Sequence, residues 1–163
     1  MITQDRLKEL FEYEDGNLIR KVSRGRGVTS KRWPAGSVLG SKKTDGYFLA
    51  SVDYHLYKLH RLIWLWHYGS FPNGQIDHID GNPSNNRIEN LREATPGENM
   101  QNQTRPRINN KLGVQGVYKV GSRYRAVLTK DKKNSHLGYF DSPQDAHKAY
   151  LEAKKQHHPF GTI

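Results

Sequence analysis

The sequence predicts an α+β protein that is assembled from small modules. The chain has 163 residues, enough for one ordinary domain or two small ones. Apolar residues make up only 34% of it and the mean hydropathy is −0.89, so a single large core is not expected. Short helix-like and strand-like runs follow one another along the chain, with polar loops between them. These observations favour several small sheets and helices over one extensive sheet.

Residues 1–59 are expected to form a mixed scaffold. A helix is predicted over residues 4–12, because Leu7, Leu10 and Phe11 fall on one face of it. The turn-forming residues that follow separate this helix from short strand-like runs. The strands are expected at residues 18–20, 47–52 and 56–59, and the next helix, closed by Gly69, at residues 60–68.

A basic stretch rich in glycine and serine interrupts this scaffold between residues 20 and 43. It holds eight Lys and Arg residues and no acidic residue. One interpretation is a solvated loop, and the other is an arm that follows a phosphate backbone. The absence of compensating acids favours the arm. The DNA contacts predicted in it are Arg24, Arg26, Lys31 and Arg32.

The overall charge also indicates a polyanionic partner. The net charge is +10, from 26 Lys and Arg against 16 Asp and Glu. Ribosomal proteins, RNA binders and membrane-surface proteins share this property. The absence of cysteine excludes disulfides, thiolate zinc sites and cysteine nucleophiles. The charged N-terminus and a longest apolar run of only residues 62–66 predict no signal peptide and no membrane span, so a cytoplasmic location is expected.

The residues with a chemical role are expected between positions 73 and 103. Hydrolysis of a phosphodiester requires a base and a cation that keeps open coordination positions. Asp77 and Asn99 could offer oxygen ligands of the kind that Mg²⁺ prefers, and His78 could act as the base. Periodicity alone does not tell whether the chain folds back to bring them together. The expected elements are strands at 76–79 and 90–94, a loop of turn formers between them, and a helix from Pro96.

Several strings between residues 60 and 103 carry a resemblance to a known family. They are His-Arg-Leu-Ile-Trp at 60–64, Asp-His-Ile-Asp-Gly-Asn at 77–82, Asn-Asn-Arg-Ile-Glu-Asn-Leu at 85–91 and Glu-Asn at 98–99. They closely resemble the HNH homing endonucleases that are common in phages. The resemblance covers about a quarter of the chain and implies the ββα-metal, or His-Me finger, fold over residues 60–104.

The resemblance also implies a role for individual positions. Asp77 matches the aspartate metal ligand, and Asn99 matches the last metal ligand, which is His in many members. His78 matches the general base that activates water. Asn90 matches the middle asparagine, which braces the hairpin and its loop. The implied reaction is hydrolysis of DNA to 5′-phosphate and 3′-hydroxyl ends, by nicking or double-strand cleavage, with Mg²⁺ as cofactor and Mn²⁺ as the alternative.

The C-terminal part is expected to form a second module, residues 112–163, behind a polar linker at residues 105–111. Residues 105–163 hold 12 Lys and Arg against 4 Asp and Glu, a net charge of +8. This part is therefore predicted to be the main electrostatic contact with nucleic acid. The expected elements are strands at 116–119, 124–129 and 136–140 and a helix at 143–155.

This module carries a second resemblance. Gly-Val-Tyr-Lys at 116–119, Tyr-Arg-Ala at 124–126 and His-Leu-Gly-Tyr-Phe-Asp-Ser at 136–142 are similar to the Apetala/ethylene-response-factor DNA-binding domain. That domain is a three-stranded antiparallel sheet packed on one helix. His136, Tyr118 and Thr129 depart from the tryptophan and arginines of plant members, so the plant target sequence is not implied. The predicted contacts to DNA are Lys119, Arg123, Arg125 and Lys130, the alternative being a solvated sheet face.

The sequence therefore predicts an HNH endonuclease that acts on double-stranded DNA, with no membrane and no small-molecule cofactor. One rival is a DNA-binding regulator that no longer cuts, which intact Asp77, His78 and Asn99 disfavour. Another is an RNA-binding basic protein, which the lack of an aromatic stacking motif disfavours. The oligomeric state, monomer or dimer, stays open. Arg87 and Arg92 are candidate phosphate contacts, and exposed, solvated arginines are the alternative.

Overall fold

The computed structural model describes residues 1–23, 33–103, 106, 110–130 and 133–161, which form two compact units. The first unit is Met1–Ala94 and the second is Thr95–Ile163. The expected scaffold at 1–59 and the following residues up to 94 thus belong to the same unit. The predicted contacts Arg24, Arg26, Lys31 and Arg32 lie outside the described residues. No helix within the described part of the chain is long and apolar enough to cross a membrane.

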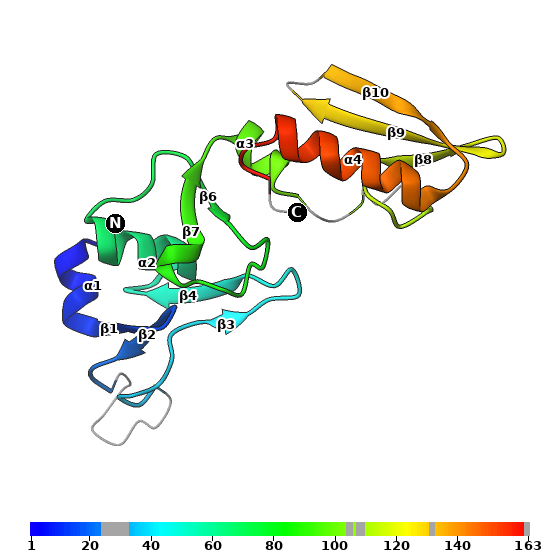
Figure 1. The fold of residues 1–163 in the computed structure, drawn as a ribbon. Coiled ribbons are helices and arrows are strands. Elements are labelled where there is room, and N and C mark those ends of the chain that lie inside the picture. The colour runs from blue at the N-terminus through cyan, green and yellow to red at the C-terminus, as the bar shows by residue number, and fades with distance from the viewer. Residues whose placement is uncertain (24–32, 104–105, 107–109, 131–132, 162–163) are drawn as a thin grey trace. The chain divides into compact units, whose positions relative to one another are not determined.

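In its described residues, the first unit combines two α-helices and a short 3-10 helix with three small antiparallel sheets (Figure 1). Its sheets are β1–β2, β3–β4–β5 and β6–β7, each formed by neighbouring strands. Strands β6 and β7 flank the loop that the sequence predicted between the strands at residues 76–79 and 90–94. The elements are α1 (Gln4–Leu10), β1 (Phe11–Glu14), β2 (Asn17–Arg20), β3 (Ser41–Lys42), β4 (Phe48–Val52), β5 (His55–Lys58), α2 (Leu59–Tyr68), β6 (Gln75–His78), η1 (Ile88–Asn90) and β7 (Leu91–Ala94).

The first helix is shorter than its apolar pattern predicts. Thr3 caps α1, since its side chain accepts a hydrogen bond from the backbone N–H of Arg6. Phe11, with φ −135° and ψ 156°, is already extended and begins strand β1. The prediction of a helix to residue 12 is wrong because the burial of Phe11 comes from a strand that pairs with β2, in which Phe11 faces Arg20.

The described residues of the first unit share a hydrophobic core, and α2 contributes several of its most buried side chains. Leu59, Leu62 and Ile63 of this helix are all at most 1% exposed. They pack with residues from α1, β2, β4, β6 and β7. Burial of one such side chain contributes about 1.5–3 kcal/mol, so this core fixes the β6–β7 hairpin against α2. α1 and α2 lie side by side (Figure 1).

The second unit contains a three-stranded antiparallel sheet packed on one long helix (Figure 1). The strand order is β10–β9–β8, and α4 packs against all three strands. The expected strands and helix are present, although the second and third strands are longer than predicted. The elements are α3 (Pro96–Gln101), β8 (Val117–Val120), β9 (Arg123–Lys130), β10 (Lys133–Phe140) and α4 (Pro143–His157).

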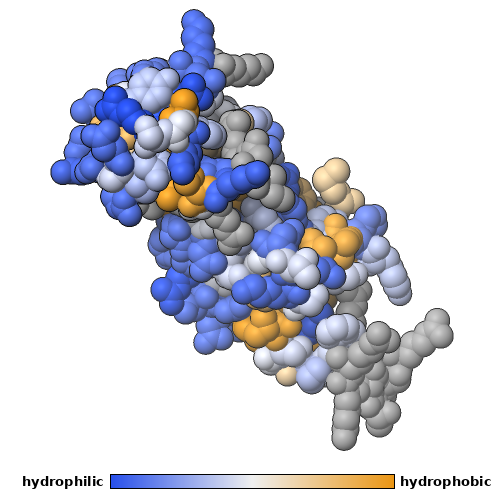
Figure 2. All heavy atoms as spheres, turned by 90° about the vertical axis from the view of Figure 1, so that its right-hand side faces the viewer, coloured by the Kyte–Doolittle hydropathy of each residue, from blue (hydrophilic) through white to orange (hydrophobic). Residues whose placement is uncertain are grey.

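Close packing of α4 against the start of β8 requires a glycine. Gly116 has φ +73°, and a Cβ placed on it would lie 2.1 Å from the ring of Tyr150. Only glycine allows both this backbone conformation and the close approach of the ring. Tyr150, Ala146 and Val117 are buried in the small core between α4 and the sheet. The face of the molecule in Figure 2 is mostly hydrophilic, with its apolar residues in small separate patches.

Candidate active site

The end of β6 brings two polar residues into the core of the first unit. Asp77 and His78 are 5% and 4% exposed, and they face Arg92 and Leu91 of β7. Both lie at the end of β6 and close to Tyr47, whose ring centroid is 5.8 Å from that of His78 and whose pKa is raised by burial and also by the Asp77 charge. A buried carboxylate and a buried imidazole each require a partner, and each has one.

Asp77 is paired with a guanidinium from the neighbouring strand. Its Oδ2 accepts hydrogen bonds from Nε of Arg92 at 2.9 Å and from Nη2 at 2.7 Å. The Arg92 side chain is 24% exposed and that of Asp77 only 6%, so water screens this ion pair little. Arg92 therefore neutralises and orients the carboxylate, a role that the sequence did not indicate. The pairing depends on the β6–β7 register, which cannot be derived from the two strands separately.

His78 is held by a hydrogen bond and by aromatic rings. Its Nε2 lies 3.1 Å from Oδ1 of Asn86, which is itself 4% exposed. Because an amide oxygen accepts, Nε2 carries the proton and Nδ1 is the basic nitrogen of the neutral ring. The ring centroids of His60 and Tyr47 lie 5.2 Å and 5.8 Å from that of His78. Burial lowers the pKa of His78, although the Asn86 bond acts in the opposite direction.

The imidazole ring of His60 borders this site and is uncharged. It is 5% exposed, and burial together with the nearby His78 lowers its pKa to about 3. It therefore stays neutral at physiological pH and presents a ring edge to His78 at an interplanar angle of 80°.

Asn90 fastens the loop between β6 and β7. Its Nδ2 donates to Oδ1 of Asp80 at 3.0 Å and to the carbonyl of Asn85 at 2.8 Å. Its Oδ1 accepts from the backbone N–H of Asp80 at 3.0 Å. The backbone N–H of Ile79 also donates to the carbonyl of Asn90 at 2.9 Å. The Asn90 side chain thus connects residues near both ends of the loop that places Asn86 next to His78.

Asn99 lies on α3, which starts directly after β7. Thr95 accepts from the backbone N–H of Glu98, and the Glu98 carboxylate accepts from that of Thr95 at 2.8 Å, so a capping box begins the helix. α3 belongs to the second unit, and a shared site of Asn99 with Asp77 stays a prediction. Within the described ranges no group of three or more His, Cys, Asp or Glu residues could hold a metal.

The basic residues that the sequence assigned to DNA have different surroundings. Arg87 forms an exposed ion pair with Asp15, with Nε–Oδ1 and Nη2–Oδ2 distances of 2.7 Å. Arg123 forms another with Asp141, with an Nε–Oδ1 distance of 3.0 Å. Both guanidiniums lie at the surface, where such pairs contribute little to stability.

Strand alternation divides the four basic residues of the C-terminal sheet between two faces. Ala126 and Leu128 of β9 are buried towards α4, so the alternate residues Arg123 and Arg125 point to the outer face. The guanidinium of Arg125 lies 5.9 Å from the ring of Tyr118 on that face. Lys119 and Lys130 share the parity of the buried residues Val117 and Leu128, respectively, and are exposed near the strand ends.

Comparison with known proteins defines the class of the first of these sites. Residues 57–101 match the family model described as HNH endonuclease. Residues 57–101 are therefore similar to an HNH endonuclease domain, and this similarity supports the prediction of a DNA-cleaving hydrolase. Asp77, His78, Asn90 and Asn99 all lie inside the matched segment. The match does not extend to residues 112–163, whose second resemblance stays a prediction.

Two viral proteins are similar to this chain. Protein 3.8 of Escherichia phage T7 is 37% identical over 81 residues, which are 48% of this chain and 66% of that protein. A protein of Acanthamoeba polyphaga mimivirus described as the uncharacterized HNH endonuclease L560 is 27% identical over 154 residues, 91% of this chain and 80% of that protein. The chain thus spans just under two thirds of the phage protein. No solved structure matches it.

Proposed function

We propose that this protein is a metal-dependent endonuclease that hydrolyses phosphodiester bonds of double-stranded DNA to 5′-phosphate and 3′-hydroxyl ends. The observation that carries the proposal is the buried Asp77–His78 pair at the end of β6, inside the segment that matches the HNH endonuclease family. A buried imidazole beside a buried carboxylate costs folding free energy, so catalysis is a better account of the pair than packing.

His78 is the general base of the proposed reaction. Asn86 binds Nε2, and Nδ1 is the nitrogen proposed to accept a proton from the attacking water. The depressed pKa keeps the ring neutral, and hence able to accept a proton, at physiological pH. Asn90 acts indirectly, because its hydrogen bonds fix the loop that places Asn86 beside His78.

The metal ligands of the proposal are Asp77 and Asn99. Their carboxylate and amide oxygens fit Mg²⁺, which takes few protein ligands and retains waters, and Mn²⁺ is the alternative. When bound, the cation would stabilise negative charge on the departing 3′ oxygen. Arg92 holds the Asp77 carboxylate in one orientation through its two bonds to Oδ2.

The second unit is proposed to bind the DNA that the first unit cuts. Arg123 and Arg125 on the outer sheet face, and Lys119 and Lys130 near the strand ends, supply positive charge there. Residues 105–163 carry a net charge of +8, which favours binding to phosphates in a salt-dependent manner. Tethering this unit to the nuclease domain raises the local concentration of the active site on DNA.

The test is relaxation of supercoiled plasmid by wild type, His78→Ala and His55→Ala, each with Mg²⁺ or with EDTA. His55 is an exposed histidine of β5, so its replacement controls for loss of any imidazole. We expect cleavage by wild type and His55→Ala with Mg²⁺ only, and a rate at least about a hundredfold lower for His78→Ala. The ratio of nicked to linear product shows whether one or both strands are cut.

Two outcomes would contradict the proposal. Cleavage by His78→Ala at the wild-type rate would remove His78 as the base. Failure of the wild type to cut plasmid, and also DNA of the source genome, would favour a DNA-binding protein that no longer cuts.

A further inference from the structure

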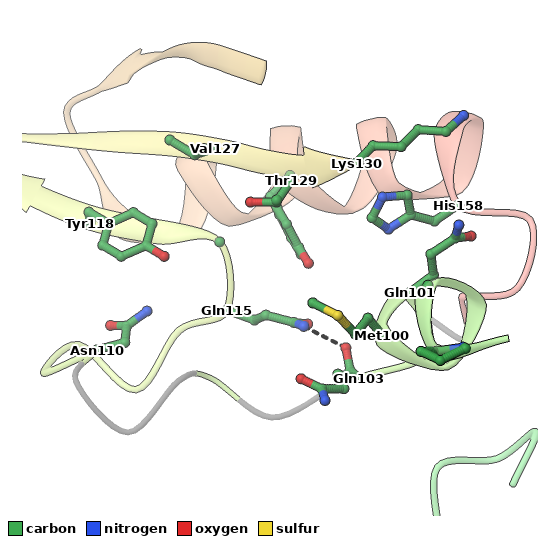
Figure 3. A pocket seen from close by; sticks show the side chains of 14 residues that line it. Met100, Gln101, Gln103, Asn110, Gln115, Tyr118, Val127, Thr129, Lys130 and His158 are labelled. Atoms are coloured by element: carbon green, nitrogen blue, oxygen red, sulfur yellow. Dashed lines mark hydrogen bonds between the residues drawn. The ribbon is translucent and has the colours of Figure 1, made fainter. Parts of the chain in front are cut away.

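A pocket of about 510 Å³ lies within the second unit, at the end of its sheet (Figure 3). Strand β8 pairs with β9 only as far as Ala126, and the last residues of β9 extend beyond it. α3 lies opposite this extension, and the pocket opens between them, with Met100 and Gln101 on one side and Thr129 and Lys130 on the other (Figure 3). The volume lies in the range of sites for small molecules, roughly 300–1,000 Å³.

Part of the pocket wall is apolar and suited to a flat ring. Met100, Tyr118 and Val127 line it and come from α3, β8 and β9. Met100 is 59% exposed, so its thioether can move onto a ring that enters. Tyr118 presents its aromatic side chain from β8 (Figure 3). Sulfur and aromatic surfaces of this kind stabilise bases that have left a stack.

The polar part of the wall contains buried atoms whose bonding capacity is unused. Oε1 of Gln101 is buried without a hydrogen-bond partner among the described residues, and the buried ring nitrogens of His158 have no partner there beyond the backbone of Thr129. His158 is only 6% exposed, and its ring lies between Lys130 and Gln101 (Figure 3). Buried polar groups without a partner are costly, and they are expected where a ligand completes the bonding.

The pocket uses a different face of α3 from the candidate metal ligand. Successive residues of a helix are about 100° apart, so Gly97, Met100 and Gln101 share one face and Asn99 lies on another. An occupant of the pocket would therefore sit about one helix diameter, roughly 10 Å, from Asn99. It would contact the same helix without competing for the metal.

We propose that this pocket binds a single unstacked nucleobase, with the phosphate of the same nucleotide at Lys130. A base requires apolar surfaces for its faces and both donors and acceptors for its edge, which an amide and an imidazole supply together. The one cation among the lining residues named in Figure 3 suits one phosphate. The inference rests on the proposed binding of DNA by this unit. The nucleotide is either an extrahelical residue of the DNA or a free mononucleotide.

The experiment compares two labelled duplexes with the full-length protein in EDTA, by fluorescence anisotropy. One duplex is fully paired, and the other carries a single unpaired adenine as a bulge. We expect the bulged duplex to bind about tenfold more tightly, because its base is already unstacked. Millimolar dAMP should remove this advantage while binding to the paired duplex is unchanged.

Gly97 offers a variant that fills the pocket with little risk to folding. A Cβ at this position meets nothing nearer than Oγ1 of Thr95 at 4.0 Å, and replacing a helical glycine favours the helix. Gly97→Leu should abolish the preference for the bulge, and Gly97→Ala, which gains helix propensity but leaves the pocket open, should retain it. Gln101→Met, which keeps the shape of the side chain but removes the amide, should reduce the preference.

The outcomes separate this inference from the proposed function. Equal binding of both duplexes together with no binding of dAMP, or a preference that survives in Gly97→Leu, overturns the pocket assignment and leaves DNA binding intact. Loss of binding to both duplexes in the wild type overturns DNA binding by this unit and the inference with it. Binding of dAMP without any preference for the bulge, measured by calorimetry, assigns the pocket to a free nucleotide instead of an extrahelical base.

Discussion

The buried polar residues around His78 show how much of the site depends on partners far away in the sequence. The string Asp-His at 77–78 pointed to a carboxylate ligand and a base. The sequence did not show that Arg92 pairs with Asp77 or that the Asn86 amide oxygen accepts a hydrogen bond from His78. The first contact depends on strand register and the second on closure of the loop. Both are decided by packing of the β6–β7 hairpin in three dimensions, so local patterns could not predict them.

Replacement of Arg92 should destabilise the first unit. Arg92→Met leaves the buried Asp77 carboxylate without its guanidinium, which we expect to lower the free energy of unfolding by about 2 kcal/mol. Urea denaturation measures the loss. Millimolar Mg²⁺ should recover part of it if Asp77 binds the cation, because a ligand of the native state stabilises that state.

The control for Arg92 is Arg87→Met. Arg87 also pairs with an aspartate, but both side chains of that pair are more than half exposed. Water and salt screen the attraction between two exposed charges, so we expect no measurable change in the free energy of unfolding. If the two arginine variants were equally stable, the buried position of the Asp77–Arg92 pair would have no energetic consequence.

At the scale of elements, the sequence predicted the strands and helices that carry strong local signals. The β6–β7 pair, the helix with a capping box at Thr95, and the three strands and helix of the C-terminal unit are present where they were expected. Strand β1 was missed because Phe11 continues the apolar face of α1, and only its pairing with Arg20 shows that the chain is extended there. The length of β10 was underestimated because Lys133 and Asn134 are polar strand residues with no apolar alternation.

The loop between β6 and β7 provides a prediction at the same scale. Asn90→Ala removes three hydrogen bonds that connect Asn90 with Asp80 and Asn85. We expect the variant to lose about 2 kcal/mol of stability and to cleave plasmid about tenfold more slowly, because the loop that carries Asn86 loosens. Hydrogen exchange at the amide of Asp80 should accelerate.

Asn82→Ala is the matched control for this loop. Asn82 accepts from the backbone N–H of Ser84 at the exposed loop tip, at 3.1 Å, and its replacement should leave cleavage unchanged. Slower cleavage by Asn82→Ala to the same extent would mean that the whole loop, and not the brace at Asn90, controls the rate.

At the scale of the whole molecule, charge and chemistry are separated along the chain. Residues 1–104 have a net charge of only +2, whereas residues 105–163 have +8. The candidate catalytic and metal-binding residues lie between positions 77 and 99, and most of the positive charge follows them along the chain. This distribution was readable from composition, since net charge needs no knowledge of the fold. Which face of the sheet carries the charge required the strand register.

Two matched double variants test whether the outer sheet face binds DNA. Arg123→Gln with Arg125→Gln removes two charges from that face, and Lys148→Gln with Lys155→Gln removes two exposed charges from α4, which packs on the other face. If the arginines each contact a phosphate, the slope of log affinity against log salt should fall by roughly 2 for the sheet variant, at about 0.9 for each phosphate contact. The α4 variant should keep nearly the wild-type slope, because its charges act only at long range through screening salt. Equal slopes for both variants would show that net charge alone attracts the DNA, and a lower slope for the α4 variant alone would assign DNA binding to the helix face.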